Sequence, residues 1–340
     1  MFAAAPLRPS LPFLTTVLTS DFDYDLPPEL IAAHPLAERS ASRMLVVDRT
    51  RGTLEHRRFS DITGFSREGD LWVLNNTRVV PARFFSNDGR QEVLRVDVLA
   101  PQRWRCMVKP GKRFRPGHCM AIGEAVGTVL EVLDNGDRVI EFDQPVDEER
   151  HGHLALPPYM ERQDEEADRE RYQTVYAQSA GAIAAPTAGL HFTPGILAQL
   201  AHAFVTLHVG VGTFQPVKAE RITDHVMHRE RYEIPAATAD AVAAARRVIA
   251  VGTTSMRTLE ASAREHGAAT AGSGSTDIFI YPGFEFRVCG ALLTNFHLPK
   301  STLLMLVSAF AGRELIREAY AEAVRERYRF FSYGDCMLIV

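Results

Sequence analysis

Two hydrophobic patterns alternate along the chain and divide it into parts. The apolar runs at 43–49 and 70–77 have the length and composition of buried strands. Beyond residue 156, similar runs alternate with segments of helical period, which is typical of an α/β layered domain. In the last helical segment, Tyr320 and Val324 recur one turn apart and predict a single buried stripe.

Other short segments also carry structural signals. "PELIAAHP" follows two prolines and predicts a short amphipathic helix. The highly charged segment 161–171 predicts a solvated helix or linker rather than a binding surface. "FIYPGF" has the composition of a strand, and residues 267–276 contain only small residues and predict a mobile loop.

Between residues 79 and 155 the pattern changes to short strands without helical period. Asn87-Asp88-Gly89 and Asn135-Gly136 supply the turn residues that hairpins require. We therefore predict the α/β class: a layered α/β/α domain formed by 21–78 and 156–340, with an inserted small antiparallel β-barrel domain at 79–155. We expect residues 1–20 to form a disordered extension rather than a signal peptide, because proline interrupts their apolar segment.

Composition limits the classes of function. The 340 residues are 46% hydrophobic with a net charge of −4, so any nucleic-acid surface must be local. The four cysteines are scattered without a CxxC pair, which argues against a disulfide framework or a zinc site and favours a reducing cytoplasm. No apolar run reaches the roughly 18 residues that a membrane span needs.

A local basic surface is encoded in the barrel insert. "RWRCMVKPGKRFRPG" contains no acidic residue, and Trp104 and Phe114 offer stacking faces. This combination is expected where a protein binds RNA phosphates and unstacked bases. The simpler alternative is a basic barrel rim without a ligand. The candidate RNA-binding residues here are Lys109, Lys112, Arg113 and Arg115.

Polar residues follow several strands of the α/β domain, where ligands of such sheets collect. In "VIAVGTTSMRTLE", Thr253, Ser255 and Arg257 stand at a predicted helix start and can hold a carboxylate or phosphate. The alternative is an ordinary helix cap. The Gly210-Val211-Gly212 turn lacks the third glycine of a dinucleotide fingerprint and is a weak signal.

Histidines in turn-rich junctions are the candidate acid/base groups. "GAIAAPTAGLHFTP" places His191 among small residues, and "LLTNFHLPKST" places His297 directly after an apolar strand. His225 and His228 stand three apart, and on a helix their imidazoles would lie side by side. Metal binding is the less favoured interpretation because no third ligand follows at a suitable spacing. Proton transfer by one histidine and structural roles for the others remain open.

Several long segments together resemble one family. They are "FDYDLPPELIAAHPLAERSASRMLVV", "VLNNTRVVPARF", "VKPGKRFRPG", "YQTVYA", "GAIAAPTAGLHFTP", "FVTLHVGVGTFQPVK", "DHVMHRERYEI", "VIAVGTTSMRTLE", "DIFIYPGFEFRV", "LLTNFHLPKSTLLMLVSAFAG" and "YRFFSYGDCMLI". In unbroken order from about residue 21, they resemble the S-adenosylmethionine:tRNA ribosyltransferase-isomerases of queuosine biosynthesis.

The resemblance implies an unusual use of S-adenosylmethionine as a co-substrate that donates its ribosyl group. The acceptor would be the aminomethyl group of 7-aminomethyl-7-deazaguanine at the wobble position of a tRNA anticodon loop. The products would be epoxyqueuosine-tRNA, adenine and methionine, with no metal required. The resemblance also implies an α/β domain with a β-barrel domain, and we expect a cytoplasmic monomer that does not bind membranes.

This chemistry calls for groups that move protons. An alkylamine has a pKa of about 10 and attacks only when neutral, and the C5′ hydrogen beside the sulfonium needs a base. We therefore predict His191 and His297 as acid/base groups, with His225 or His228 supported by Asp224 as the second choice.

Other residues are candidates for binding the two substrates. Those expected to contact S-adenosylmethionine are Thr187, Gly189, Gly210, Gly212, Thr213, Thr253, Ser255 and Arg257, with Phe192, Phe214 and Tyr281 as aromatic faces for the sulfonium. Arg78 and Arg83 are expected to contact RNA near the hinge between the domains.

Two other classes of function remain open. An S-adenosylmethionine-dependent RNA methyltransferase would release S-adenosylhomocysteine instead of adenine and methionine, but the usual glycine-rich motif is missing. A non-catalytic RNA-binding protein would keep its RNA affinity after substitution of His191 and His297.

Overall fold

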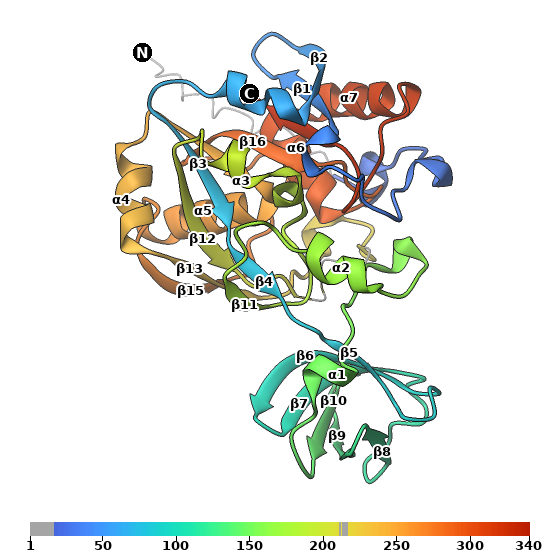
Figure 1. Ribbon diagram of the computed structural model, residues 1–340. Helices are drawn as coiled ribbons and strands as arrows, with labels where there is room; N and C mark the ends of the chain where they lie inside the picture. Colours follow the sequence, from blue (N-terminus) through green and yellow to red (C-terminus); the bar gives the residue numbers. More distant parts are fainter. Residues whose placement is uncertain (1–16, 211, 213–216) are drawn as a thin grey trace, which may run out of the picture.

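The computed structural model of the protein describes residues 17–210, 212 and 217–340. It contains a larger α/β body and a smaller barrel-like body, which are joined by two passages of the chain (Figure 1).

The larger body is built on one mixed sheet of nine strands. In spatial order these are β15 (Gly272–Thr276), β13 (Glu230–Ile234), β12 (His202–Leu207), β3 (Asp70–Asn75), β14 (Arg247–Val251), β16 (Cys289–Asn295), β17 (Cys336–Ile339), β1 (Arg43–Asp48) and β2 (Thr53–Arg58). Strands β12, β3, β14 and β16 are parallel, whereas β17 and β1 run the opposite way. The carboxyl ends of the first four and the amino ends of β17 and β1 therefore share one edge, here called the carboxyl edge.

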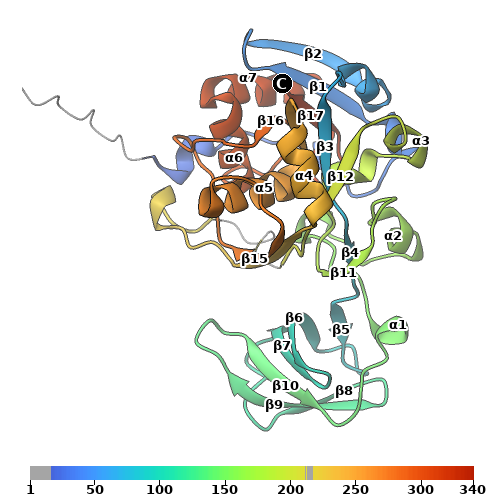
Figure 2. The same ribbon diagram turned by 90° about the vertical axis from the view of Figure 1, so that its left-hand side faces the viewer.

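Both faces of this sheet are covered, as Figure 2 shows. Along β1, Leu45 and Val47 face one core, while Met44 and Val46 face another on the opposite side. This alternation follows from the two-residue period of a strand. The first core is covered by α4 (Ala236–Ala244), α5 (Gly252–His266), α6 (Thr302–Ala311) and α7 (Arg313–Arg325). The second is covered by η4 (Phe59–Phe65), η6 (Thr187–His191) and α3 (Pro194–Leu197). The predicted layered α/β class is confirmed.

The smaller body is a six-stranded antiparallel sheet that curls into a nearly closed barrel with a hydrophobic core of its own. Its strands, in spatial order, are β5 (Arg83–Phe85), β6 (Glu92–Ala100), β7 (Arg103–Lys109), β10 (Arg138–Phe142), β9 (Ala125–Val132) and β8 (Cys119–Ile122). Asn87, in the β5–β6 turn, bonds to Ala121 and Gly123 and so joins the two ends of the sheet. The predicted β-barrel insert is thus present.

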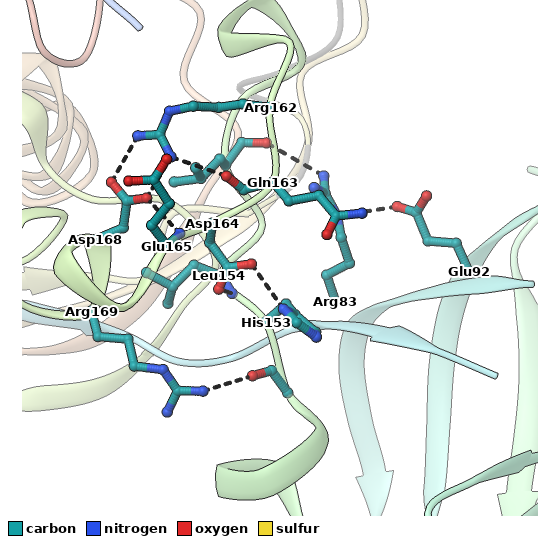
Figure 3. Close-up of polar contacts among 12 residues, drawn as sticks. Arg83, Glu92, His153, Leu154, Arg162, Gln163, Asp164, Glu165, Asp168 and Arg169 are labelled. Atoms are coloured by element: carbon teal, nitrogen blue, oxygen red, sulfur yellow. Dashed lines mark hydrogen bonds and ion pairs between the residues drawn. The ribbon is translucent and has the colours of Figure 1, made fainter. Parts of the chain in front are cut away.

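The two bodies meet at a network of polar contacts, shown in Figure 3. The passage into the barrel is β4 (Thr77–Val79), paired with β11 (Ser179–Ala182). The returning passage contains α1 (Glu148–His151) and leads to α2 (Glu166–Arg171). The Asp164 carboxylate accepts a hydrogen bond from Leu154 N at 2.9 Å and lies 2.9 Å from Nδ1 of His153.

Three local predictions were wrong. Within "PELIAAHP" only the three residues of η2 (Pro28–Leu30) are helical, because a backbone bond from Ala32 to Phe330 draws the chain away. The predicted mobile loop ends in β15, which pairs with β13. "FIYPGF" at 279–284 forms no strand.

Four other short helical turns lie in the described ranges. They are η1 (Thr19–Phe22), η3 (Arg39–Ala41), η5 (Pro158–Met160) and η8 (Ile222–Asp224). Of the predicted extension, residues 1–16 lie outside the described residues. From Leu18 onward the chain packs on the α/β body, where the Thr19 hydroxyl donates to Ala219 O.

Candidate functional site

Several of the predicted site residues come together at the carboxyl edge. Three segments meet there: η6, the first turn of α5 and the end of β16. Gly252, the first residue of α5, has φ +86°, a conformation that glycine adopts without strain. A Cβ at this position would lie 3.7 Å from the Cβ of Ala188, so α5 begins in contact with η6.

His191 lies at the end of η6 and is almost completely buried. Its Nδ1 lies 2.8 Å from the Ser42 hydroxyl, and its Nε2 lies 3.2 Å from Oδ1 of Asn295. The Asn295 amide donates to Phe331 O, so its Oδ1 is the acceptor and Nε2 carries the proton. Burial lowers the pKa of His191 to about 4, and the charges of Arg39 and Arg329 act in the same direction. The imidazole is therefore neutral at pH 7.

His297 follows β16 on the other side of Asn295. Its Nε2 lies 2.9 Å from the Thr294 hydroxyl, and its backbone N–H donates to the Tyr320 hydroxyl. Burial lowers the pKa of His297 to about 3. The two first-choice histidines thus flank Asn295 as buried, neutral imidazoles.

A buried ion pair occupies the neighbouring part of the edge. Arg257 of α5 donates to Oε2 of Glu230 on β13 at 2.6 Å, and both side chains are at most 7% exposed. The other carboxylate oxygen accepts from Gly210 N at 3.1 Å. The expected anion-binding arginine therefore already has one carboxylate partner, and this pair fixes the turn after β12.

The small polar residues take different roles. The Ser255 hydroxyl is fully buried and donates to Val251 O, so it stabilises its own helix. Thr253 is 7% exposed, and Thr187 is half-buried at the start of η6. A Cβ on Gly189 would come within 2.0 Å of the Tyr176 hydroxyl, so Gly189 is required for close packing of the chain.

His225 and His228 lie in the segment before β13. The structure does not place them on one helix, because η8 ends at Asp224. His228 packs on the backbone of Gly212, where a Cβ would approach within 2.4 Å. Burial and the nearby His228 lower the pKa of His225. Asp224 is exposed, and no hydrogen bond joins it to either imidazole in the described residues.

The aromatic candidates are separated. Phe192 is completely buried and packs edge-on against Phe59, so it is a core residue. Tyr281 lines an open cavity with His225 and Phe279 on the far side of β13. Thr213 and Phe214 lie outside the described residues.

The basic residues of the barrel lie on one loop. The exposed basic side chains are Lys109 at the end of β7 and Lys112, Arg113 and Arg115 in the loop between β7 and β8. Trp104 and Phe114 were wrongly expected to stack on bases, since they form the barrel core with 2% and 0% exposure.

The two hinge arginines differ. Arg78 is exposed on β4 and faces solvent. Arg83 lies 3.1 Å from Glu92 and also donates to Leu156 O, so it takes part in the junction between the bodies (Figure 3).

Three polar residues near His191 were not predicted from the sequence. Ser42, Arg39 and Arg171 line a small depression that His191 closes at its base. Arg39 and Ser42 stand in "AERSASR", a polar stretch without turn or strand signals, and Arg171 belongs to the charged segment that we predicted to be solvated. Only the tertiary structure brings them together.

The described ranges contain no group of three or more His, Cys, Asp or Glu side chains placed to hold a metal ion. Within the same ranges, no helix has both the length and the apolar character needed to cross a bilayer. The four cysteines are unpaired, and three of them are buried.

Comparison with known proteins identifies the family. Residues 19–339 match the family described as "Queuosine biosynthesis protein". The chain belongs to this family. The resemblance inferred from the sequence motifs is thereby confirmed.

Curated relatives are similar along their whole length. The S-adenosylmethionine:tRNA ribosyltransferase-isomerase of Geobacter metallireducens is 53% identical, over 94% of this chain and 98% of that protein. The protein of the same name from Symbiobacterium thermophilum is also 53% identical, over 94% and 99%. A solved structure, the S-adenosylmethionine tRNA ribosyltransferase of Thermotoga maritima, is 39% identical, covers 94% of this chain and 100% of its own, and has a TM-score of 0.56.

Proposed function

We propose that the chain catalyses the reaction for which these relatives are named. It transfers the ribosyl group of S-adenosylmethionine to tRNA and isomerises it. The observation that carries this function is the family match over residues 19–339, together with about 50% identity to full-length relatives. In finer detail, the acceptor is the aminomethyl group of 7-aminomethyl-7-deazaguanine at the wobble position, and adenine and methionine leave.

The carboxyl edge is a suitable place for this chemistry. Ligands of open α/β sheets bind beyond the carboxyl ends of the strands, and the barrel extends from this same edge through β4 (Figure 1). A tRNA bound there can contact both bodies, with its wobble nucleotide turned out of the anticodon stack. The exposed Lys112, Arg113 and Arg115 are placed to hold phosphates on the barrel.

For the proton transfers we propose His191 and His297, with His225 or His228 as the second choice. A neutral imidazole is the form that accepts a proton, and both buried histidines are neutral at pH 7. Ser42 and Asn295 fix the orientation of the His191 ring. Arg257 is proposed to share its guanidinium between Glu230 and the methionine carboxylate of the donor.

The experiment uses the purified chain, tRNA that carries the aminomethyl-deazaguanine, and S-adenosylmethionine labelled in the ribose. We expect free adenine, free methionine and label in the tRNA. Adenine release should persist in EDTA, and the enzyme should elute as a monomer. S-adenosylhomocysteine as the product would instead indicate a methyltransferase, and RNA binding without turnover would indicate a binding protein.

A further inference from the structure

A small depression opens beside His191 at the carboxyl edge. We call it the arginine pocket. Its lining includes Arg39, Arg171, Ser42, His191, Ser332 and Tyr333. Its volume of about 20 Å³ holds roughly one water-sized group. It is therefore too small for a nucleoside or a methionyl chain, but it can receive an oxygen that projects from a larger ligand held outside.

The positive charges around this pocket have few opposite partners. Arg39 donates to Leu190 O and Glu170 O, and Arg171 donates to Leu36 O and Ala37 O. These carbonyls satisfy N–H groups but carry no net charge. In the described part of the chain neither arginine forms an ion pair with a carboxylate.

A third arginine, Arg329, lies near His191 and disfavours a proton on it. Arg329 is half-buried, and its Nη2 donates to His34 O. The nearby carboxylates compensate these three arginines only partly. Glu38 is exposed on the rim, Glu170 is exposed beside Arg39, and Asp335 accepts the backbone N–H groups of Arg43 and Arg329.

Burial and neighbouring charges both act on these groups. Burial lowers the pKa of the Arg39 guanidinium, which Arg171 lowers further and Glu170 raises, and burial lowers the pKa of Arg329 while Asp335 raises it. The same arginines disfavour a proton on His191. An anion in the pocket would favour the charged form of these guanidinium groups, and guanidinium groups bind oxyanions with good geometry.

We propose that the arginine pocket binds one phosphodiester group of the tRNA anticodon loop, next to the nucleotide that is modified. This inference rests on the proposed function and adds a contact point to it. A nucleic-acid backbone presents single phosphate oxygens from a body too large to enter, which matches the size of the pocket. The pocket borders α2, on the side of the α/β body that faces the barrel (Figure 1). One RNA chain can thus reach both the pocket and the basic loop.

Phosphate binding here has a consequence for His191. The anion neutralises part of the charge of Arg39 and Arg329, and the pKa of His191 then rises from its low value. Docking of the RNA would thereby make this buried imidazole a stronger base. Ser42 connects the two sites, since it lines the pocket and its hydroxyl contacts Nδ1 of His191.

The main test leaves the protein unchanged and neutralises the RNA one phosphate at a time. Anticodon stem-loops carrying a single methylphosphonate at each position around the wobble nucleotide are titrated into the wild-type protein. A methylphosphonate at one position should weaken binding to the wild-type protein about tenfold. The same methylphosphonate should not weaken binding to Arg39→Gln or Arg171→Gln any further. Equal losses at all positions in the wild type and the variants would overturn the proposal.

A second measurement distinguishes a phosphate of the RNA from the methionine carboxylate of S-adenosylmethionine as the oxyanion in the pocket. For Arg39→Gln we expect the slope of log K against log salt to fall by about 0.7 to 0.9, the value of one phosphate contact. KM for S-adenosylmethionine should be unchanged. A raised KM with an unchanged salt slope would instead place the methionine carboxylate in the pocket.

Arg51→Gln is the matched control for these variants. It removes one charge from the exposed turn between β1 and β2, at the opposite edge of the sheet, and should bind every RNA like the wild type. If the wild type neither releases adenine nor binds the unmodified stem-loop, the proposed function itself fails. If it does both but no phosphate position responds, only the pocket assignment fails.

Discussion

At the scale of single residues, the carboxyl edge contains buried histidines whose pKa values lie below their ordinary value. His191 and His297 are neutral because burial penalises their charged form, and each accepts or donates to a neutral neighbour. A structural role and a catalytic role both require this geometry. The two roles can be distinguished by replacing the imidazole ring with a side-chain amide, which keeps one of the hydrogen bonds but cannot transfer a proton.

The low pKa of His191 predicts a pH-dependent stability. In the unfolded chain a histidine titrates near 6.5, whereas folded His191 titrates near 4. Between these values the unfolded state binds more protons, so stability is complete above pH 6.5 and is lost as the pH falls toward 4. His191→Gln should remove about 2 kcal/mol of this loss between pH 7.5 and pH 5, measured from urea midpoints at these two pH values. The exposed His34→Asn should keep the wild-type dependence. An equally steep loss in His191→Gln would contradict the burial argument.

Breaking the Glu230–Arg257 ion pair should strongly lower the free energy of unfolding, and removing the second charge as well should restore most of it. Glu230→Gln leaves a buried guanidinium without its carboxylate and should cost about 3 to 5 kcal/mol in the free energy of unfolding. The double variant Glu230→Gln/Arg257→Met should recover most of this loss, because it removes the unpaired charge as well. A double-mutant cycle by chemical denaturation gives the coupling energy. Additive effects of the two substitutions would show that the pair does not act as a unit.

At the scale of elements, the sequence predicted what local patterns control. The apolar runs of β1 and β3, the helical stripe of α7 and the turn at Asn87 were all visible in the sequence, because period and turn chemistry are local. The helix at η2 was predicted too long and β15 was predicted to be a loop, since the conformation of these segments depends on distant partners such as Phe330 and β13.

The candidate site was predictable only in part. His191 and Arg257 stood out as polar residues beside apolar strands, which is a local signal. The partners that determine their behaviour, Ser42 and Glu230, come from remote segments and carry no such signal. Trp104 shows the opposite error. A basic neighbourhood suggested an exposed stacking face, but strand alternation turns this side chain into the barrel core.

The loop between β7 and β8 supports a prediction at this scale. Reversing the charges of Lys112, Arg113 and Arg115 to Glu should weaken tRNA binding at least tenfold and flatten its dependence on salt. Binding of S-adenosylmethionine should not change. Reversal of Arg57 and Arg58 on β2, at the other end of the molecule, is the control. Fluorescence anisotropy at several salt concentrations makes the comparison, and unchanged affinity would exclude the loop from the RNA site.

At the scale of the whole molecule, two bodies with separate hydrophobic cores are joined by a junction of polar contacts and a small apolar cluster around Ala82, Ala155 and Ile183. The predicted acid/base residues and Arg257 belong to the α/β body, whereas the basic loop belongs to the barrel. On this proposal, we expect binding of the small donor to depend on one body and binding of tRNA to depend on how the two bodies are held together. Asp164 is the residue best placed to separate these requirements, because its buried carboxylate contacts both His153 and Leu154 (Figure 3).

Asp164→Ala should loosen the barrel without damaging the site. Loss of the carboxylate leaves Leu154 N without its acceptor, at a local cost of about 1 to 3 kcal/mol. Small-angle scattering should then show a broader distribution of distances. The value of kcat/KM for tRNA should fall several-fold, while KM for S-adenosylmethionine stays constant. Glu166→Ala, an exposed change in the first turn of the adjacent α2, should leave all three quantities unchanged. If Asp164→Ala kept both the scattering curve and the tRNA kinetics of the wild type, the relative position of the two bodies would have to be fixed by contacts other than this junction.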